Sequence, residues 1–409
     1  MLKILYYSLI DISAANGPAV NELTFLTSLL ASRSSQVRAV IPEPRHPVGL
    51  AQDERVHFIP GAAVDSFSRR LFIRFSGVRA LLAQNRAFRP DVWVIRAPVL
   101  PVCEAIGVLI ASPTCFALKT FSGHPLGFVK AQRGPKRVLG AAVLPPHIFC
   151  QWLLARSANV IDVTTDQHAC GVRRWYGVPR SRVEVVGNAV DHGPFRSARI
   201  SHASASRSDE GATRVHVLGY VGRKPVERGG VEVLRAIHSA RRRGMAWKGI
   251  VVGCAPTEKK HLENLAVKLG IDRHVQVSGV IPYDEVPSLM ARLDIGVAFD
   301  SAERLAVVGN SNQKVRQYIA SGAWVVTAGP GNGFLLDNDV GTLVSGCRTD
   351  AILSQMDKIQ SEDSSQRSQR IKRSWEVAEH LLSMDSATQR RLKLWQNGTS
   401  QNLAPGNSR

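Results

Sequence analysis

Residues 215–230 carry the sequence VHVLGYVGRKPVERGG, and the class of fold follows from it. Val215 to Val221 is a nearly continuous apolar run, which is typical of a strand buried on both faces. Gly222 permits a tight turn, and Arg228-Gly229-Gly230 opens a segment whose apolar residues have helical spacing. A strand that leads through a glycine turn into a helix is the repeating unit of a doubly wound α/β sheet.

The same alternation of strand and helix continues after this unit. The further strands that we expect are Lys248 to Val252, Val275 to Val277, Ile295 to Phe299 and Trp324 to Thr327. The expected helices are Gly230 to Arg243, Lys259 to Leu269, Asp284 to Ala291 and Asn312 to Ser321, with a last helical stretch from Asp350 to Trp395. This order favours a parallel sheet wrapped by helices.

The first half of the chain has the same pattern. Its expected strands are Leu2 to Leu9, Gln36 to Ile41, Arg55 to Ile59, Asp91 to Arg96, Pro113 to Lys119 and Asn159 to Thr164. A polar, Ser- and Ala-rich stretch from Arg196 to Arg214 separates the halves and is typical of a linker. We therefore predict two Rossmann-like doubly wound domains that face each other across a cleft. The predicted parts are a first domain at 1–195, a linker at 196–214, a second domain at 215–349, helices at 350–397 that pack back across the domains, and a disordered tail at 398–409.

Positive charge dominates the composition. The chain of 409 residues has a formal net charge of +19, of which residues 1–200 hold +12 through 24 Lys and Arg against 12 Asp and Glu. Such an excess indicates an anionic partner, which is nucleic acid, an anionic membrane or a phosphorylated ligand. Nucleic acid is disfavoured, because no aromatic-interleaved basic stripe, zinc knuckle or helix-turn-helix pattern occurs.

Other classes of protein are also disfavoured. No G-x-G-x-x-G follows the first expected strand, which argues against a nucleotide-dependent oxidoreductase. The longest apolar region, Leu100 to Leu118, is interrupted by Pro101, Glu104 and Pro113, so we expect no membrane-spanning helix. Six scattered cysteines without a C-x-x-C pair indicate a reduced, cytoplasmic protein and no metal site.

The turn after the strand at Val215 to Val221 is a candidate phosphate site. Free backbone N–H groups at a helix N-terminus attract anions, and Gly222 leads into such a helix. Arg223 and Arg228 are placed to clamp a diphosphate from two sides, although basic residues in a turn are also common as plain surface. Gly253 ends the next expected strand, where a glycine permits close approach of a ligand.

A second candidate phosphate site lies at the start of the helix at Asn312 to Ser321. Ser311 is placed to cap this helix, and Lys314 falls in its first turn. A cation there opposes the helix dipole unless an anion is present, so Lys314 is consistent with a bound phosphate.

Taken together, these stretches resemble the glycosyltransferases of the GT-B fold, most closely glycosyltransferase family 4 (the glycosyltransferase group 1 domain). The similar motifs are ANVIDVTT at 158–165, YGVP at 176–179, VEVVGNAVD at 183–191 followed by Phe195, Gly222-Arg223 with Arg228-Gly229, and QKVRQYIASGAWVV at 313–326. The motifs follow one another in the order and spacing of that family.

The resemblance implies roles for particular residues. Arg223 and Arg228 would contact the diphosphate of a UDP- or GDP-sugar, backbone N–H groups near Ser311 and Asn312 would meet its distal phosphate, and Gly17 would lie near the phosphates and the sugar. Lys119 falls at or near a position where many relatives have a histidine that faces the sugar, and His124 is the rival for that role.

At two positions the chain departs from the family. Relatives commonly have two glutamates separated by seven residues, and here those positions hold Gly309 and Gln317, with Glu303 as the nearest acid. Gln317 can still form hydrogen bonds to a ribose or a sugar. The alternative function is therefore a catalytically weak or inactive GT-B protein that serves as a partner subunit.

The resemblance implies a retaining, metal-independent transfer of a hexose-like sugar to a lipid-linked or polysaccharide acceptor, as in polysaccharide biosynthesis. The segment from Phe67 to Leu82 has apolar residues at helical spacing, with arginines around them. A basic amphipathic helix can lie on an anionic membrane, although the same stripe can pack on its own sheet. We expect peripheral attachment to the cytoplasmic face of a membrane.

Overall fold

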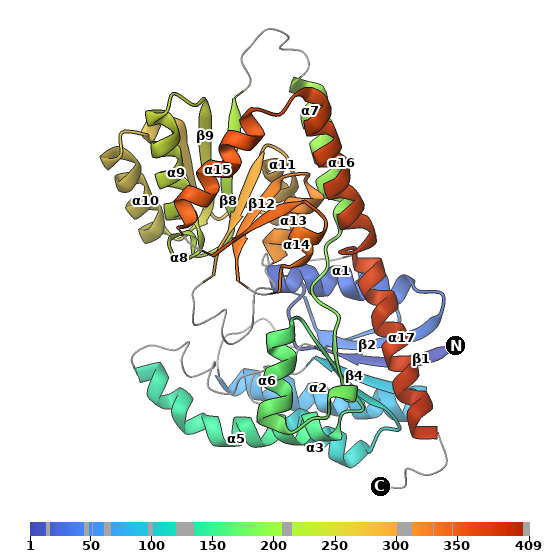
Figure 1. The fold of residues 1–409 in the computed structure, drawn as a ribbon. Helices are drawn as coiled ribbons and strands as arrows, with labels where there is room; N and C mark the ends of the chain where they lie inside the picture. The colour runs from blue at the N-terminus through green and yellow to red at the C-terminus, as the bar shows by residue number, and fades with distance from the viewer. Residues whose placement is uncertain are drawn as a thin grey trace. The chain divides into compact units, whose positions relative to one another are not determined.

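The chain forms two compact units, each built on a parallel sheet (Figure 1). Unit 1 comprises Met1–Gly187 and Met384–Arg409, and unit 2 comprises Asn188–Ser383. The structure is a computed structural model. It describes residues 1–13, 17–44, 49–50, 52–60, 67–96, 101–119, 135–206, 215–300, 313–329, 331–345 and 347–403.

The sheet of unit 1 has seven strands in the order β3-β2-β1-β4-β5-β6-β7, and every neighbouring pair is parallel. The strands are β1 (Leu2–Tyr7), β2 (Ser35–Pro42), β3 (Val56–Ile59), β4 (Val92–Arg96), β5 (Phe116–Lys119), β6 (Val160–Val163) and β7 (Val183–Val185). All but β7 were predicted. The order reverses between β1 and β4, as in a doubly wound sheet.

Helices cover both faces of this sheet (Figure 1). They are α1 (Gly17–Ala31), α2 (Phe67–Phe88), α3 (Val102–Ala111), α5 (Pro135–Ser157), α6 (Asp166–Tyr176) and α17 (Met384–Leu403). Helices α2, α3, α5 and α6 contribute to one core cluster with the strands, whereas α1 and α17 pack together on the other face.

Alternate residues of the central strands divide the core of unit 1. Tyr7 of β1 points toward the α2, α3 and α5 side, where it shares a cluster with Trp93 and Phe116. Tyr6 points to the opposite face, and its ring centroid lies 5.6 Å from that of Phe25 in α1. Because both faces are covered, the strands are apolar almost throughout, as expected of a buried parallel sheet.

The sheet of unit 2 has six parallel strands in the order β10-β9-β8-β11-β12-β13. The strands are β8 (His216–Val221), β9 (Trp247–Cys254), β10 (Val275–Gly279), β11 (Ile295–Ala298), β12 (Trp324–Ala328) and β13 (Gly341–Val344), and all but β13 were predicted. The helices are α7 (His192–Ser206), α8 (Pro225–Arg228), α9 (Gly230–Arg242), α10 (Pro256–Lys268), α11 (Val286–Met290), α13 (Gln313–Ala320), α14 (Phe334–Asp337), α15 (Arg348–Gln360) and α16 (Ser364–His380).

The predicted linker at 196–214 is wrong over its first part. Residues up to Ser206 belong to α7, while 207–214 lie outside the described residues. Phe195 and Arg199 of α7 are buried, and Nη1 of Arg199 donates to the backbone carbonyl of Leu293 at 2.9 Å. The composition of this stretch is that of a linker, but one apolar and one basic side chain anchor it to unit 2, which already begins at Asn188.

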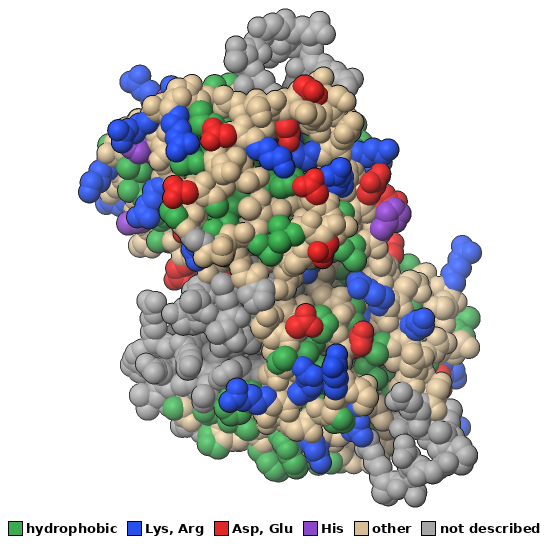
Figure 2. Space-filling view, viewed as in Figure 1, with side chains coloured by type: hydrophobic (Ala, Val, Ile, Leu, Met, Phe, Trp, Pro, Cys, Tyr) green, Lys and Arg blue, Asp and Glu red, His purple; other side chains and the backbone are tan. Residues whose placement is uncertain are grey.

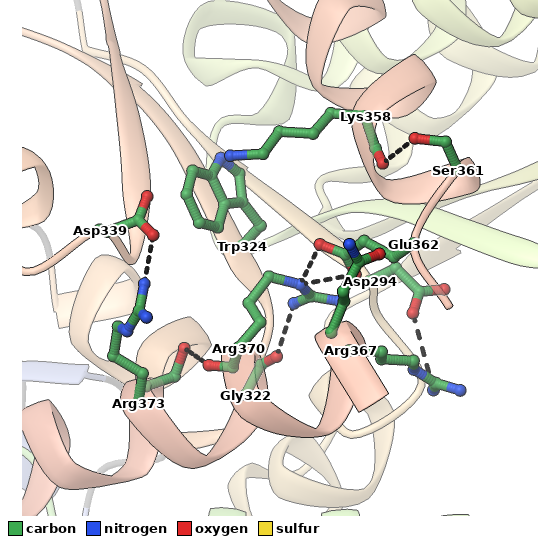
Figure 3. A network of polar contacts seen from close by, with 12 residues as sticks. Asp294, Gly322, Trp324, Asp339, Lys358, Ser361, Glu362, Arg367, Arg370 and Arg373 are labelled. Atoms are coloured by element: carbon green, nitrogen blue, oxygen red, sulfur yellow. Dashed lines mark hydrogen bonds and ion pairs between the residues drawn. The ribbon is translucent and has the colours of Figure 1, made fainter. Parts of the chain in front are cut away.

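The stretch predicted as a final helical region consists of three helices, and two of them belong to unit 2. Helix α16 is held there by a polar network (Figure 3). Nε of Arg370 lies 2.9 Å from Oε1 of Glu362, and its Nη1 donates to the carbonyl of Gly322 at 3.2 Å. One turn further on, Arg373 pairs with Asp339, and both of these side chains are exposed.

Helix α17 belongs to unit 1 and extends to Leu403, so the predicted disordered tail from residue 398 is helical at its start; 404–409 lie outside the described residues. Nε of Arg391 lies 2.6 Å from Oδ2 of Asp162 in β6, and both side chains are buried. Near its start, the hydroxyl of Ser28 in α1 donates to Asp385 at 2.7 Å.

Within the described ranges, no helix combines the length and the apolar character that crossing a bilayer requires.

Candidate functional site

The carboxyl end of the sheet in unit 2 brings together the turn after β8 and the start of α13. The strand order reverses between β8 and β11, and ligands of doubly wound sheets bind at such a switch point. Helices α8 and α9 begin directly after this turn, at Pro225 and Gly230. The N-terminus of α9 supplies the positive end of a helix dipole at this edge.

Two glycines pack backbone against backbone at this edge. Gly222 has φ 142° and donates its N–H to the carbonyl of Val252 at 2.9 Å. Gly253 has φ 100°, and a Cβ at that position would lie 2.4 Å from the carbonyl oxygen of Gly222. We predicted Gly253 as a place of close ligand approach, but the group that approaches it is the Gly222 backbone.

Lys314 reaches the Gly222 turn from α13. Its side chain is buried, and Nζ donates to the hydroxyl of Tyr220 at 2.5 Å and lies 4.0 Å from the centroid of that ring. A Cβ at Gly222 would lie 3.0 Å from the same Nζ. The Tyr220 hydroxyl in turn donates to the backbone carbonyl of Arg223 at 2.7 Å. Burial raises the pKa of Tyr220, so the phenol that Lys314 contacts is neutral.

The two predicted arginines have different surroundings. The side chain of Arg223 is exposed and has no hydrogen bond or ion pair to any residue that the structure describes. Arg228 is half-buried at the end of α8, and its Nε lies 3.3 Å from Oδ1 of the buried Asp300. Only Arg223 therefore has its charge fully available at the turn, whereas Arg228 shares its charge with an acid that sequence reasoning missed.

Gln317 of α13 is buried, and its Nε2 donates to the hydroxyl of Tyr283 at 2.8 Å. Gln313 and Arg316 of the same helix donate to backbone carbonyls of Ala189 and Asn188, both at 2.6 Å. Gln317 thus has a partner within the protein, which we did not predict, and it would contact a ribose only with its remaining hydrogen-bonding capacity.

A pocket of about 440 Å³ opens at the carboxyl ends of β9 and β10, next to Gly253. Its volume is in the range of small-molecule sites. It is lined by Val252, Gln276, Ser278, Ile281, Asp284, Glu285, Ser288, Leu289 and Arg292. This pocket was not predicted as a unit, although the strand ends that form it were.

Lys119 lies in unit 1, at the end of β5, and is buried in a charged cluster. Its Nζ lies 3.2 Å from Oε2 of Glu22 and 3.2 Å from the hydroxyl of Tyr6, and it is 3.2 Å from the centroid of the Phe25 ring. Burial lowers the pKa of Lys119 to about 7, with a further contribution from Arg96, while Glu22 opposes the shift. The geometry is that of a buried ion pair, which differs from the predicted role of Lys119 in facing a sugar.

Glu22 was missed by sequence reasoning. Burial alone would raise its pKa, but the cations of Lys119 and Arg96 outweigh burial and lower the pKa to about 2. A signal for its position exists, because Glu22 falls three residues after Ala19 and four before Leu26, which are both buried on the inner face of α1.

Most of the remaining predicted site residues lie outside the described part of the chain. Gly17 begins α1. Ser311, Asn312, His124, Gly309 and Glu303 lie outside the described residues. In the part of the chain that the structure describes, no group of three or more His, Cys, Asp or Glu is placed to hold a metal ion.

Residues 215–361 match the family described as Glycosyl transferases group 1. Part of the chain also resembles a 2-deoxystreptamine glucosyltransferase from Streptomyces kanamyceticus, with 28% identity over 152 residues. That match spans 36% of this chain and only 37% of the relative, so it concerns about a third of either protein.

Solved structures extend the similarity to the whole fold. A glycosyltransferase from Rickettsia africae has a TM-score of 0.67 at 11% identity, covering 100% of this chain and 99% of its own. The Anabaena protein HepE in complex with UDP-glucose has a TM-score of 0.65 at 14% identity, covering 97% and 100%. WaaG, a glycosyltransferase involved in lipopolysaccharide biosynthesis, has a TM-score of 0.61 at 14% identity, covering 99% and 100%. With its two parallel-sheet units, the chain has the GT-B fold.

Proposed function

We propose that this protein is a glycosyltransferase that takes a sugar from a nucleotide-sugar donor bound at the carboxyl end of the unit 2 sheet. The observation that carries the proposal is the convergence of Lys314, the Gly222 turn and the N-terminus of α9. Lys314 is distant in sequence from the other two, and together they form one positive, backbone-rich edge. The family match over residues 215–361 covers all of them, and the fold is one that holds UDP-glucose in HepE.

The chemistry that this edge would support is departure of a nucleoside diphosphate. When the bond between the sugar and the diphosphate breaks, its electron pair stays on the departing phosphate oxygen. Backbone N–H groups and fixed cations stabilise the developing charge most when they are already in place. We assign this role to Lys314, Arg223 and the N–H groups that open α9, with Arg228 contributing less because it shares its charge with Asp300.

The finer features are inferences from the family resemblance. We infer a retaining, metal-independent transfer from a UDP- or GDP-sugar to a lipid-linked or glycan acceptor, in the manner of polysaccharide biosynthesis. The pocket lined by Ser278 and Asp284 is placed to receive the base of the nucleotide, because it adjoins the Gly253 turn. The alternative of an inactive partner subunit is not favoured, since the groups suited to the diphosphate are present.

Nucleotide binding tests the donor site. We expect Lys314→Met and Arg223→Ala each to weaken UDP or GDP affinity about 10- to 100-fold in calorimetric titration, because each removes a charge-assisted contact to phosphate. Arg235→Ala removes an exposed cation from α9 and should leave affinity unchanged.

If neither substitution at the turn weakens nucleotide binding while the proteins stay folded, the donor site is misassigned. A second measurement tests for catalysis. An enzyme should slowly hydrolyse a nucleotide sugar, whereas an inactive subunit would bind the nucleotide without hydrolysing the sugar bond.

A further inference from the structure

The outer side of the α2, α3 and α5 layer in unit 1 exposes large apolar side chains. We call this set the apolar face, and its members are between 41% and 72% exposed. They are Phe72 and Phe75 of α2, Ile106, Leu109 and Ile110 of α3, and Phe149 and Trp152 of α5. A helix on a protein surface usually turns polar residues outward, so apolar residues on three neighbouring helices require an explanation.

The three helices that carry the apolar face are neighbours. Helix α3 contacts both α2 and α5. A Cβ at Gly107 would lie 2.7 Å from Cγ1 of Val78, so this glycine allows α2 and α3 to approach closely. On α5, the rings of Phe149 and Trp152 stack with their centroids 6.1 Å apart.

The core of unit 1 does not use these side chains. The same helices turn other apolar residues inward, including Ile73 and Leu81 of α2, Val108 of α3 and Leu154 of α5, and these are buried in the core cluster. Helix α3 is therefore apolar on both its inner and its outer side. Removing the outward residues from water requires a second surface beyond the fold of unit 1.

Among the described residues, the exposed charged side chains of α2, α3 and α5 are all basic. The sequences of α2 and α5 contain no Asp or Glu, and the acid of α3, Glu104, is buried and accepts a hydrogen bond from Tyr7 at 3.1 Å. Arg79 and Arg86 of α2 are exposed. Figure 2 shows hydrophobic side chains along its lower edge, over α5 and α3, with Lys or Arg side chains beside them.

A basic pocket adjoins the apolar face at the end of α5. It has a volume of about 420 Å³ and is lined by Arg156, Arg182, Ala155, Val178 and Pro179. The Arg156 guanidinium lies 6.0 Å from the centroid of the Trp152 ring, which belongs to the apolar face. Arginines beside a pocket of this size, next to exposed aromatic rings, match the geometry of a lipid head group whose acyl chains lie under the rings.

We propose that the apolar face docks on an anionic membrane surface, with its side chains at the acyl boundary and Arg156 and Arg182 at lipid phosphates. A lipid surface is the occupant that the charge favours, because it offers apolar depth and negative charge together. The inference rests on the proposed function in one respect: it names the surface of the protein that would approach a lipid-linked acceptor in the membrane. The sequence predicts docking through the apolar residues of Phe67 to Leu82 alone, and the proposal differs from that. In that segment Val78 is buried, and the side chains of Phe67 and Leu71 lie outside the described residues.

Flotation of the full chain with vesicles tests the proposal. At about 0.15 M salt, where charges separated by more than about 8 Å are largely screened, we expect the wild type to float with equal parts of phosphatidylglycerol and phosphatidylcholine, and much less with phosphatidylcholine alone. Leu109→Ser with Ile110→Ser should reduce the bound fraction at least 10-fold. The matched control, Val267→Ser with Leu336→Ser, removes equally exposed apolar residues from unit 2 and should float as the wild type does.

A separate pair of double variants tests the role of the basic pocket. Arg156→Ala with Arg182→Ala should weaken binding to the phosphatidylglycerol vesicles about 10-fold. Arg235→Ala with Arg241→Ala removes two exposed cations of α9 and should have little effect. Equal losses in the two pairs would mean that net charge alone drives binding, and the assignment of the pocket would be wrong.

A readout inside the apolar face does not depend on destabilising variants. Brominated lipids quench tryptophan fluorescence at short range, so vesicles that contain them should quench the wild type more than Trp152→Phe, which keeps the aromatic ring. Equal quenching in the two proteins would place Trp152 outside the bilayer and overturn the proposal.

Two further outcomes separate this proposal from others. Wild type that stays unbound to both kinds of vesicle, but is still stabilised by UDP, overturns the membrane proposal and leaves the donor site intact. A dimer that Leu109→Ser with Ile110→Ser converts to monomer, with vesicle binding unchanged, would assign the apolar face to a second copy of the chain instead.

Discussion

Two buried lysines have neighbours of opposite kinds, and these neighbours determine what each lysine can do. Lys119 lies 3.2 Å from the carboxylate of Glu22, so much of its charge is compensated inside unit 1. Lys314 meets the neutral phenol of Tyr220 and lies beside the Gly222 turn. Lys119 thus forms a buried ion pair in unit 1, whereas Lys314 lies beside the turn that we propose as a phosphate site in unit 2.

The buried carboxylate of Glu22 should make stability depend on acid pH. Its folded-state pKa of about 2 lies below the ordinary 4.5, so the stabilisation is complete above pH 4.5 and is lost as the pH falls toward 2. We expect the wild type to lose about 3 kcal/mol of unfolding free energy over this range through Glu22. Glu22→Gln should lack this loss in urea unfolding at a series of pH values, although it is less stable at pH 7.

Asp53→Asn provides the control for that series. Asp53 also pairs with an arginine, Arg55, but at the surface, where solvent screens the pair. Its substitution should leave the acid slope nearly unchanged. An acid slope that is equal in the wild type and in Glu22→Gln would show that Glu22 is not the titrating group.

Helix α16 shows at the scale of one element how burial changes the value of an ion pair. Arg370 is buried, and it donates hydrogen bonds to Glu362 and to the carbonyl of Gly322 (Figure 3). Arg373, one turn further along α16, pairs with Asp339, and both of these side chains are exposed. Removing one partner of a buried pair leaves an uncompensated charge, whereas an exposed pair contributes little.

We therefore expect Arg370→Met to lower the free energy of unfolding by about 3–5 kcal/mol and Arg373→Met by less than about 1 kcal/mol. Chemical unfolding of the two variants side by side measures the difference. Similar losses in both would contradict the role assigned to burial.

Short elements mark the limit of what could be predicted at this scale. Strands with long apolar runs, such as β1 and β8, lie where the sequence predicts them. Strands β7 and β13 have three and four residues with only partly buried side chains, so their sequences do not differ from those of loops. The sequence predicts a linker over most of helix α7 because its one buried cation, Arg199, stands among Ser and Ala.

The candidate site, like the fold, could be predicted only in part from the sequence. The sequence predicts the Gly222 turn and the start of the helix with Lys314 as two phosphate sites, and both lie at the carboxyl end of the unit 2 sheet, where ligands of parallel sheets bind. The partners Glu22, Asp300 and Tyr283 were not predictable, because their positions depend on which side chains of distant segments share a buried space. A single sequence does not contain that information directly.

At the scale of the whole molecule, unit 1 is discontinuous in sequence and unit 2 is continuous. Helix α17 supplies Arg391, the buried partner of Asp162 in β6, and it packs on α1. Unit 1 therefore depends on residues that follow all of unit 2 along the chain.

Deleting residues 384–409 should accordingly destabilise unit 1 selectively. Asp162 would be left buried without Arg391, a loss of about 3–5 kcal/mol before the packing of α17 is counted. We expect a lowered thermal transition for unit 1, while a second transition that UDP raises persists for unit 2. Deletion of 404–409 alone serves as the control, and a protein that unfolds at the same temperature after loss of 384–409 would contradict this dependence.

The return of α17 to unit 1 also has a consequence during synthesis. Asp162 is made 229 residues before its partner Arg391, and the whole of unit 2 is translated in that interval. The unit that leaves the ribosome first is thus the last to be completed. Until Arg391 arrives, the carboxylate of Asp162 has to stay exposed to water rather than buried. A nascent chain in which Ser383 has left the ribosome but Arg391 has not should carry a folded unit 2 and an unfinished unit 1, which is the reverse of the order in which the two begin to be made.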